Sequence, residues 1–202
     1  SLQYPVVSIT AIGEKKMQLR LRPDEDLVMA GYAGYAGTAI LADTYRDMLE
    51  QRYPCTLVDR AGDLAETVCV TEAARAANHF GVSAMHDVSQ GGVFAALWEL
   101  CEHAGLGLEV ELRKIPVLQE TIEICEFFDL NPYQLYGQGA LLIGTDRGES
   151  LVTELQRKGI HAVVIGRTTS GHDRIIRNGE DVRYLDKPVQ DMLWRLAERM
   201  GG

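Results

Sequence analysis

The apolar and polar residues of the chain alternate in short runs at its start and then follow the period of a helix. Residues 17–21 alternate strictly, as a strand with one buried face should, and the apolar runs on either side of them also predict strands. Three short strands are therefore expected before any helix, at residues 2–12, 17–21 and 27–30. Residues 38–53 then carry apolar side chains on one face, and the alanine-rich residues 64–80 end at a glycine, so two helices are predicted there.

The rest of the chain predicts alternating strands and helices, with a hairpin near the end. Residues 108–112 alternate apolar with acidic positions, which is typical of an edge or one-faced strand, and Asn178-Gly179 is a strong signal for a tight hairpin turn. Strands are predicted at residues 82–85, 108–112, 140–144, 161–166, 174–177 and 182–184. Helices are predicted at residues 93–104, 118–128, 149–158 and 189–200.

These elements indicate an α/β (α+β) fold in one domain. Several strands are apolar on both faces and require cover on both sides, so one mixed sheet with helices packed on it is expected. The chain has no low-complexity linker and no long repeat, and its 202 residues suffice for a sizeable core. Residues 1–202 are therefore assigned to a single domain.

The charge of the chain argues against two classes of partner. A formal net charge of -9 would repel nucleic acid and anionic lipid, so neither nucleic-acid binding nor membrane binding is expected. No apolar run approaches the roughly 20 residues of a membrane span and no signal peptide opens the chain, which favours a cytoplasmic protein. The four cysteines lack metal-ligand spacing and are expected to be reduced thiols, with Cys101 and Cys125 buried in helices.

The segment Asp87-Val88-Ser89-Gln90-Gly91-Gly92 is the strongest candidate for chemistry. Gly91 and Gly92 would let the backbone approach a ligand, and the following helix offers unpaired N–H groups and the positive end of its dipole, a combination that binds phosphate. Asp87 would repel phosphate by itself, so it either holds Mg2+ against a nucleotide or caps the helix. Ser89 could donate a hydrogen bond to a phosphate oxygen or act as the N-cap, and the sequence leaves both alternatives open.

A second glycine-rich loop covers residues 31–37 and precedes a predicted helix. Its spacing, G-x-x-G-x-x-G, matches neither the P-loop nor the dinucleotide-binding pattern, and it lacks the P-loop lysine. Gly34 and Gly37 could lie near a ligand, or they could be required for tight packing of strand against helix. Tyr32 and Tyr35 could stack on a nucleobase, the alternative being ordinary half-buried tyrosines beside a turn.

Taken in order, these motifs resemble the C-terminal domain of the aminoimidazole ribonucleotide synthetase superfamily, from about residue 9 to residue 188. Residues 85–93 are similar to the superfamily's aspartate and double-glycine signature. Residues 27–41 are similar to the strand, glycine loop and helix start of its HypE-like branch, the hydrogenase maturation proteins. The same branch is also resembled by residues 115–117, 123–132 and 179–188.

The resemblance implies a three-layer α/β/α domain that uses ATP and Mg2+. Proteins of this superfamily use ATP to phosphorylate an oxygen of their substrate, commonly that of an amide or carboxamide, and they work as dimers. Their nucleotide site also needs an N-terminal half that is absent from this sequence, so the domain is expected to require that half, in the same or a partner chain, and to be inactive alone. The implied roles are ATP or phosphate binding for Gly34, Gly37, Ser89, Gly91 and Gly92, and Mg2+ binding for Asp87.

Departures from the superfamily's pattern keep a second function open. Tyr35 and Ala36 stand where related proteins often carry an acidic residue or a histidine. Gln138 and Ala140 stand where an acidic and a basic residue are common, and the chain ends without the terminal cysteine of the HypE-like branch. The alternative is a non-catalytic interaction or assembly module derived from the same family.

Overall fold

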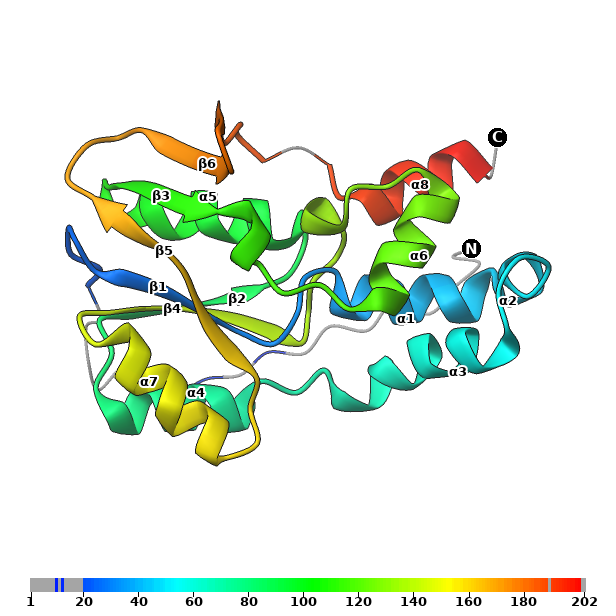
Figure 1. Ribbon diagram of the computed structural model, residues 1–202, viewed down its shortest axis with the longest axis horizontal. Coiled ribbons are helices and arrows are strands. Elements are labelled where there is room, and N and C mark those ends of the chain that lie inside the picture. Colours follow the sequence, from blue (N-terminus) through cyan, green and yellow to red (C-terminus); the bar gives the residue numbers. More distant parts are fainter. Residues whose placement is uncertain (1–9, 11, 13–19, 189, 201–202) are drawn as a thin grey trace.

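The chain folds around one seven-stranded sheet (Figure 1). The computed structural model describes residues 10, 12, 20–188 and 190–200, so the strands predicted at residues 2–12 and 17–21 lie almost entirely outside the described residues. The strands are β1 (Asp26–Ala30), β2 (Ala84–Val88), β3 (Gly107–Glu111), β4 (Ala140–Thr145), β5 (Ala162–Thr169), β6 (Arg174–Asn178) and β7 (Asp181–Tyr184).

The strand order is β2-β4-β1-β5-β3-β6-β7, and the pairing makes the sheet mixed, as predicted. β3 and β6 are parallel, whereas every other neighbouring pair is antiparallel. β3 lies between β5 and β6, so of the two alternatives the edge strand is wrong, whereas a strand with its acidic residues on one face is found. Glu109 on that face is half-buried and pairs with Arg177 of β6, which is how an interior strand accommodates a carboxylate.

Helices cover both faces of the sheet and give the predicted three layers. The alternation of side chains along β1 separates two cores, because Met29 points to the face covered by α5 and Val28 points to the face covered by α4 and α7. Figure 1 shows α4 and α7 together on one side of the sheet. The helices are α1 (Tyr35–Thr44), α2 (Arg46–Leu49), α3 (Cys55–Asp63), α4 (Thr71–Phe80), α5 (Gly92–Ala104), α6 (Gln119–Phe128), α7 (Gly148–Arg157) and α8 (Met192–Met200), with 3-10 turns η1 (Leu64–Thr67), η2 (Leu112–Lys114) and η3 (Pro132–Gln134).

A second group of helices lies beyond one end of the sheet. In Figure 1, α1, α2, α3, α6 and α8 gather on the right, away from the strands. They share an apolar core of their own, which contains Leu41 from α1, Val58 from α3, Ile124 from α6 and Leu196 from α8. None of the helices in the described part of the chain has the length and apolar composition that a membrane span requires.

Two of the predicted helices are corrected by the structure. The helix expected at residues 38–53 ends at Thr44 and is followed by the single turn α2, and α3 was not predicted. The helix expected at residues 64–80 is η1 and α4, separated by residues 68–70. Four of the five residues at 67–71 are β-branched, and such residues resist the helical conformation that the alanines on either side favour.

Two boundaries matter for the candidate site. The strand predicted at residues 82–85 is β2, which runs on to Val88, so Asp87 lies on a strand rather than in a loop. The helix predicted at residues 189–200 begins at Met192, which leaves Asp191 at its N-terminus.

Candidate functional site

Both glycine loops pack against one segment, residues 131–139, which connects α6 to β4. A side chain at Gly92 would approach the carbonyl oxygens of Tyr133 and Leu135 to 2.6 and 2.7 Å, and one at Gly37 would approach the carbonyl oxygen of Tyr136 to 2.9 Å. Gly34 lies against the same segment, with the carbonyl oxygen of Pro132 at 3.1 Å from its missing Cβ. The packing role that the sequence left open for these glycines is therefore present.

The start of α1 is held by backbone hydrogen bonds to that segment. The N–H of Ala36 donates to Gln138 O at 3.2 Å, and the N–H of Gly37 donates to Tyr136 O at 2.8 Å. The hydroxyl of Thr38 donates to Gly34 O at 2.7 Å. The two N–H groups would otherwise lack a partner at a helix N-terminus, so the protein itself supplies acceptors where a phosphate was predicted.

The start of α5 is built from two glycines in the left-handed conformation. Gly91 has φ 75° and Gly92 has φ 65°, values that favour glycine. The N–H of Gly91 donates to Asp191 Oδ2 at 2.6 Å, and the N–H of Gly92 donates to Ser89 O at 3.2 Å. A carboxylate thus accepts a hydrogen bond from the backbone at the N-terminus of α5, where the helix dipole favours negative charge.

Asp191 was missed by the analysis of the sequence. Its side chain is buried, with 4% of the residue exposed, and Oδ1 also accepts a hydrogen bond from the N–H of Leu193 at 2.8 Å. One carboxylate therefore joins the N-termini of α5 and α8. An aspartate just before an amphipathic run is an N-cap signal, so the cap of α8 could have been predicted, but its contact with Gly91 depends on the tertiary fold.

Asp87 and Ser89 lie before α5 without capping it. Neither side chain caps the start of α5 within the described residues, so the capping alternative is wrong for both. Asp87 is exposed on β2, which is an edge strand, and is paired in register with Leu141 of β4. Ser89 is half-buried, and its carbonyl accepts hydrogen bonds from the N–H groups of Gly92 and Gly137.

The donor set around Asp87 constrains any metal site. The described residues contain no group of three or more histidine, cysteine, aspartate or glutamate side chains that could hold a metal ion. His86 is directed elsewhere, with Nδ1 at 2.7 Å from Asp87 O and Nε2 at 3.4 Å from Glu99 Oε2. A single exposed carboxylate fits Mg2+ only where substrate phosphates and water complete the coordination, which is how this ion is often bound.

The tyrosines of the first glycine loop belong to an aromatic stack. Tyr32 stacks on His161 with centroids 4.6 Å apart, and on Tyr35 with centroids 6.2 Å apart. The hydroxyl of Tyr35 is hydrogen bonded to that of Thr67 at 2.7 Å. A nucleobase would have to compete with these rings for the faces of Tyr32.

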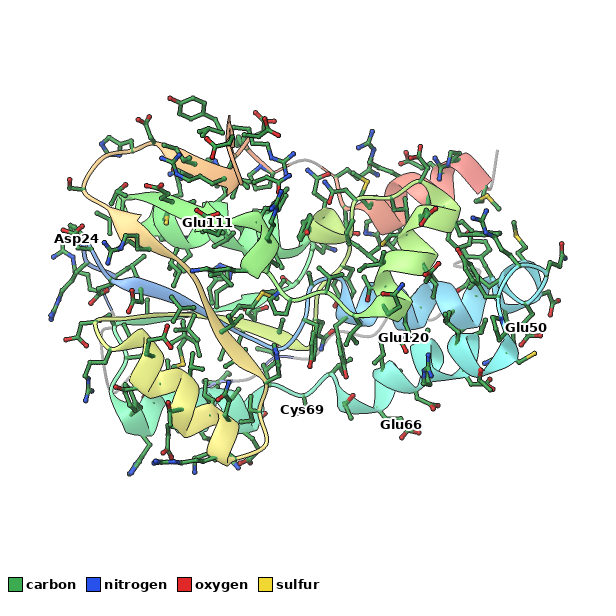
Figure 2. The ribbon with its side chains drawn as sticks, viewed as in Figure 1. Asp24, Glu50, Glu66, Cys69, Glu111 and Glu120 are labelled. Atoms are coloured by element: carbon green, nitrogen blue, oxygen red, sulfur yellow. The ribbon has the colours of Figure 1, made fainter. Side chains whose placement is uncertain are left out.

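The cysteines fall into two environments. Burial raises the pKa of Cys101 and of Cys125 to about 12, which agrees with their predicted place in helices of the core. Cys69 is exposed on the connection between η1 and α4 (Figure 2). Its pKa is lowered from that of an ordinary thiol by hydrogen bonding to the hydroxyl and the backbone of Thr71.

Comparisons with known proteins converge on one family. The family model described as AIR synthase related protein, C-terminal domain, matches residues 22–178. Carbamoyl dehydratase HypE of Rhodobacter capsulatus is 26% identical over 207 residues, covering 95% of this chain and 56% of that protein. The PurL subunit of phosphoribosylformylglycinamidine synthase from Chelativorans is 27% identical over 165 residues, covering 80% of this chain and 21% of that protein.

Solved structures show the same fold. The crystal structure of E. coli HypE aligns with a TM-score of 0.71 and 23% identity, over 88% of this chain and 54% of that one. A HypE structure in complex with ATP aligns with a TM-score of 0.62 and 19% identity, over 87% of this chain and 54% of that one. The chain therefore spans about half the length of the HypE relatives that it matches.

Proposed function

This chain belongs to the C-terminal domain family of AIR synthase related proteins, and we propose that it forms the nucleotide-facing half of an ATP-using enzyme of the HypE-like branch. The proposed reaction is ATP-dependent phosphorylation of a substrate oxygen, such as that of a carboxamide, which converts a poor leaving group into a good one. The relative named carbamoyl dehydratase and the related structure in complex with ATP support this choice.

The observation that carries the proposal is the position of Asp87. Its carboxylate is exposed on the outermost described strand, caps no helix within the described residues, and comes five residues before the first residue of α5. In that position it could hold Mg2+ against a nucleotide phosphate, while the hydroxyl of Ser89 donates to a phosphate oxygen. Gly91, Gly92, Gly34 and Gly37 then act mainly by shaping the backbone around this end of the sheet.

The other half of the site is proposed to come from an N-terminal half, in the same or a partner chain. We propose that the assembled protein is a homodimer and acts in the cytoplasm. A lone carboxylate is a weak Mg2+ site, so we expect further ligands to come from that half and the domain alone to be inactive.

The test is calorimetric titration of the protein that includes the N-terminal half with a non-hydrolysable ATP analogue and Mg2+. Asp87→Asn and Ser89→Ala are the informative variants, because Gly92 is needed for packing and its replacement would disturb the fold. Asp181→Asn, an exposed aspartate on the opposite edge strand β7, is the matched control.

We expect Asp87→Asn to weaken Mg2+-dependent binding at least tenfold, Ser89→Ala to weaken it less, and the control to bind like the wild type. Unchanged affinity of Asp87→Asn would remove Asp87 from the site. Binding that is strong without Mg2+ would contradict the metal role of Asp87 in particular.

A second candidate function is a non-catalytic assembly module of the same family. It is favoured by the internal partners of the helix N-termini, since Asp191 accepts from Gly91 and the segment at 136–138 accepts from the start of α1. If the protein with both halves failed to bind the nucleotide, while the separate domain still formed a stable complex with the N-terminal half, this function would replace the first.

A further inference from the structure

A groove runs between α1 and α3 on the surface that faces away from their shared core. Its volume is about 570 Å³, and it continues along η1. Its floor is made of small or apolar side chains, with Ala36, Ala39 and Ile40 on α1 and Ala65 on η1. Ile40 is 40% exposed, which is unusual for an isoleucine in the middle of a helix that packs on another.

Gly62 of α3 lines the groove without serving the packing of the domain. A Cβ there would meet only Arg46 Nη2, at 3.8 Å, among the described residues, and its φ is not in the left-handed region. A glycine inside a helix costs about 0.5–1 kcal/mol relative to alanine, and nothing within the described domain requires it. Gly37 and Gly92, by contrast, each lie against a neighbouring backbone. Because the end of a flexible arginine side chain is the only described neighbour above Gly62, a helix backbone could approach closely there.

The rim of the groove carries an excess of negative charge. Among the described residues that line it are Asp43, Asp59 and Asp63, together with one cation, Arg46. Arg46 is already bonded to Asp59 at 2.7 Å and to Glu50 at 3.0 Å. In the described part of the chain, Asp43 and Asp63 form no ion pair, so their charge is available to a cationic partner.

The spacing of these residues fits a helix as the occupant. Ala36, Ile40 and Asp43 follow one another at four and three positions on α1, and Asp59, Gly62 and Ala65 do so at three positions along α3 and η1. Two parallel rows of this kind form the ridges between which a third helix packs. Figure 1 shows α1 and α3 one beside the other beyond the end of the sheet.

We propose that this groove is a docking site for an amphipathic helix of another protein, one that presents apolar side chains flanked by lysine or arginine. The apolar face of the helix would cover Ile40 and Ala65, its backbone would approach Gly62, and its cations would meet Asp43 and Asp63. This interaction does not depend on nucleotide binding, so the docking proposal and the nucleotide proposal are tested separately.

The test uses a synthetic 15-residue helical peptide with leucine along one face and lysine at the flanking positions, titrated calorimetrically into the domain. The control peptide has glutamate at each lysine position. Gly62→Leu fills the groove from a position where, among the described residues, an added Cβ meets only the flexible end of Arg46 at 3.8 Å. It should therefore leave the fold intact, and an unfolding curve verifies that. Ser150→Leu, on the exposed side of α7, is the matched control.

We expect the lysine peptide to bind the wild type and Ser150→Leu equally, and to bind Gly62→Leu at least tenfold more weakly. Asp43→Asn and Asp63→Asn should each weaken binding about 2- to 5-fold, as exposed ion pairs do, and the loss should shrink at high salt. Glu149→Gln on α7 serves as their control.

Three results would overturn the proposal. One is the absence of binding by the lysine peptide, and another is equal binding of the two peptides. The third is self-association of the wild type that Gly62→Leu abolishes, since the groove would then receive a second copy of this chain.

Discussion

The same substitution at two glycines is expected to change the stability of the domain in opposite directions. Gly92→Ala places a Cβ on a residue with φ 65°, against backbone carbonyl oxygens at 2.6 and 2.7 Å. Gly62→Ala places one in the last turn of α3, where the nearest described atom is the end of a flexible arginine at 3.8 Å. Because both variants add the same methyl group, the difference between their stabilities reports only the local backbone and packing at the two positions.

The magnitudes follow from the backbone and the packing. A left-handed conformation costs an L-residue about 1–2 kcal/mol, and insertion of a methyl group into a packed interior costs about 1–3 kcal/mol. Gly92→Ala should thus lower the free energy of unfolding by about 2–5 kcal/mol. Gly62→Ala should raise it by about 0.5–1 kcal/mol, because alanine restricts the unfolded chain and favours the helix.

Urea unfolding followed by circular dichroism measures both changes. With a urea dependence of about 1–3 kcal/mol per molar, the midpoint should move down by about 1 M or more for Gly92→Ala and slightly up for Gly62→Ala. A loss below about 0.5 kcal/mol at Gly92 would refute the close approach of α5 to residues 133–135. A loss at Gly62 would show that the groove is not open above it.

Three further outcomes are expected. Asp191→Ala should lower the free energy of unfolding by about 1–3 kcal/mol, because the buried Gly91 N–H loses its acceptor and α8 loses its cap, and urea unfolding beside Asp191→Asn, which keeps an oxygen, measures the difference. Cys69, whose pKa is lowered, should be the first thiol alkylated as the pH rises from 6, and mass mapping after iodoacetamide treatment identifies it. Burial raises the pKa of Cys101 and Cys125 to about 12 from 9.0, so the native state keeps protons that the unfolded state releases. The contribution of these thiols to the free energy of unfolding is complete below pH 9 and is lost as the pH rises toward 12. Unfolding curves at pH 8 and pH 10.5 would record this loss.

The sequence predicted those elements whose hydrophobic period is long and uninterrupted. α5, α6, α7 and the hairpin of β6 and β7 lie within two residues of their predicted bounds, because each has a regular apolar face or a defined turn. The failures occur where local preferences conflict. Residues 64–80 are rich in alanine, yet the β-branched residues at 67–71 interrupt the helix, and α3 was missed because its apolar face, with Val58 and Ala61, is small.

The candidate site was predictable in part. The segment at 87–92 and the loop at 31–37 could be found from glycine and aspartate spacing alone. The segment at 131–139, against which both loops pack, carries no motif, and the bond from Gly91 to Asp191 joins residues 100 positions apart. Such contacts depend on strand order and register, which no local pattern specifies.

The glycines of this chain show why a motif cannot by itself assign a ligand. Gly34, Gly37 and Gly92 belong to the patterns that suggested phosphate binding, yet each is required by a backbone that passes within contact of it. Gly62 belongs to no pattern, and within the described residues the domain has no need of it. A glycine that the fold explains says little about a ligand, so the nucleotide hypothesis rests on Asp87 and Ser89. A glycine that the fold does not explain suggests instead that a binding partner approaches the surface above it.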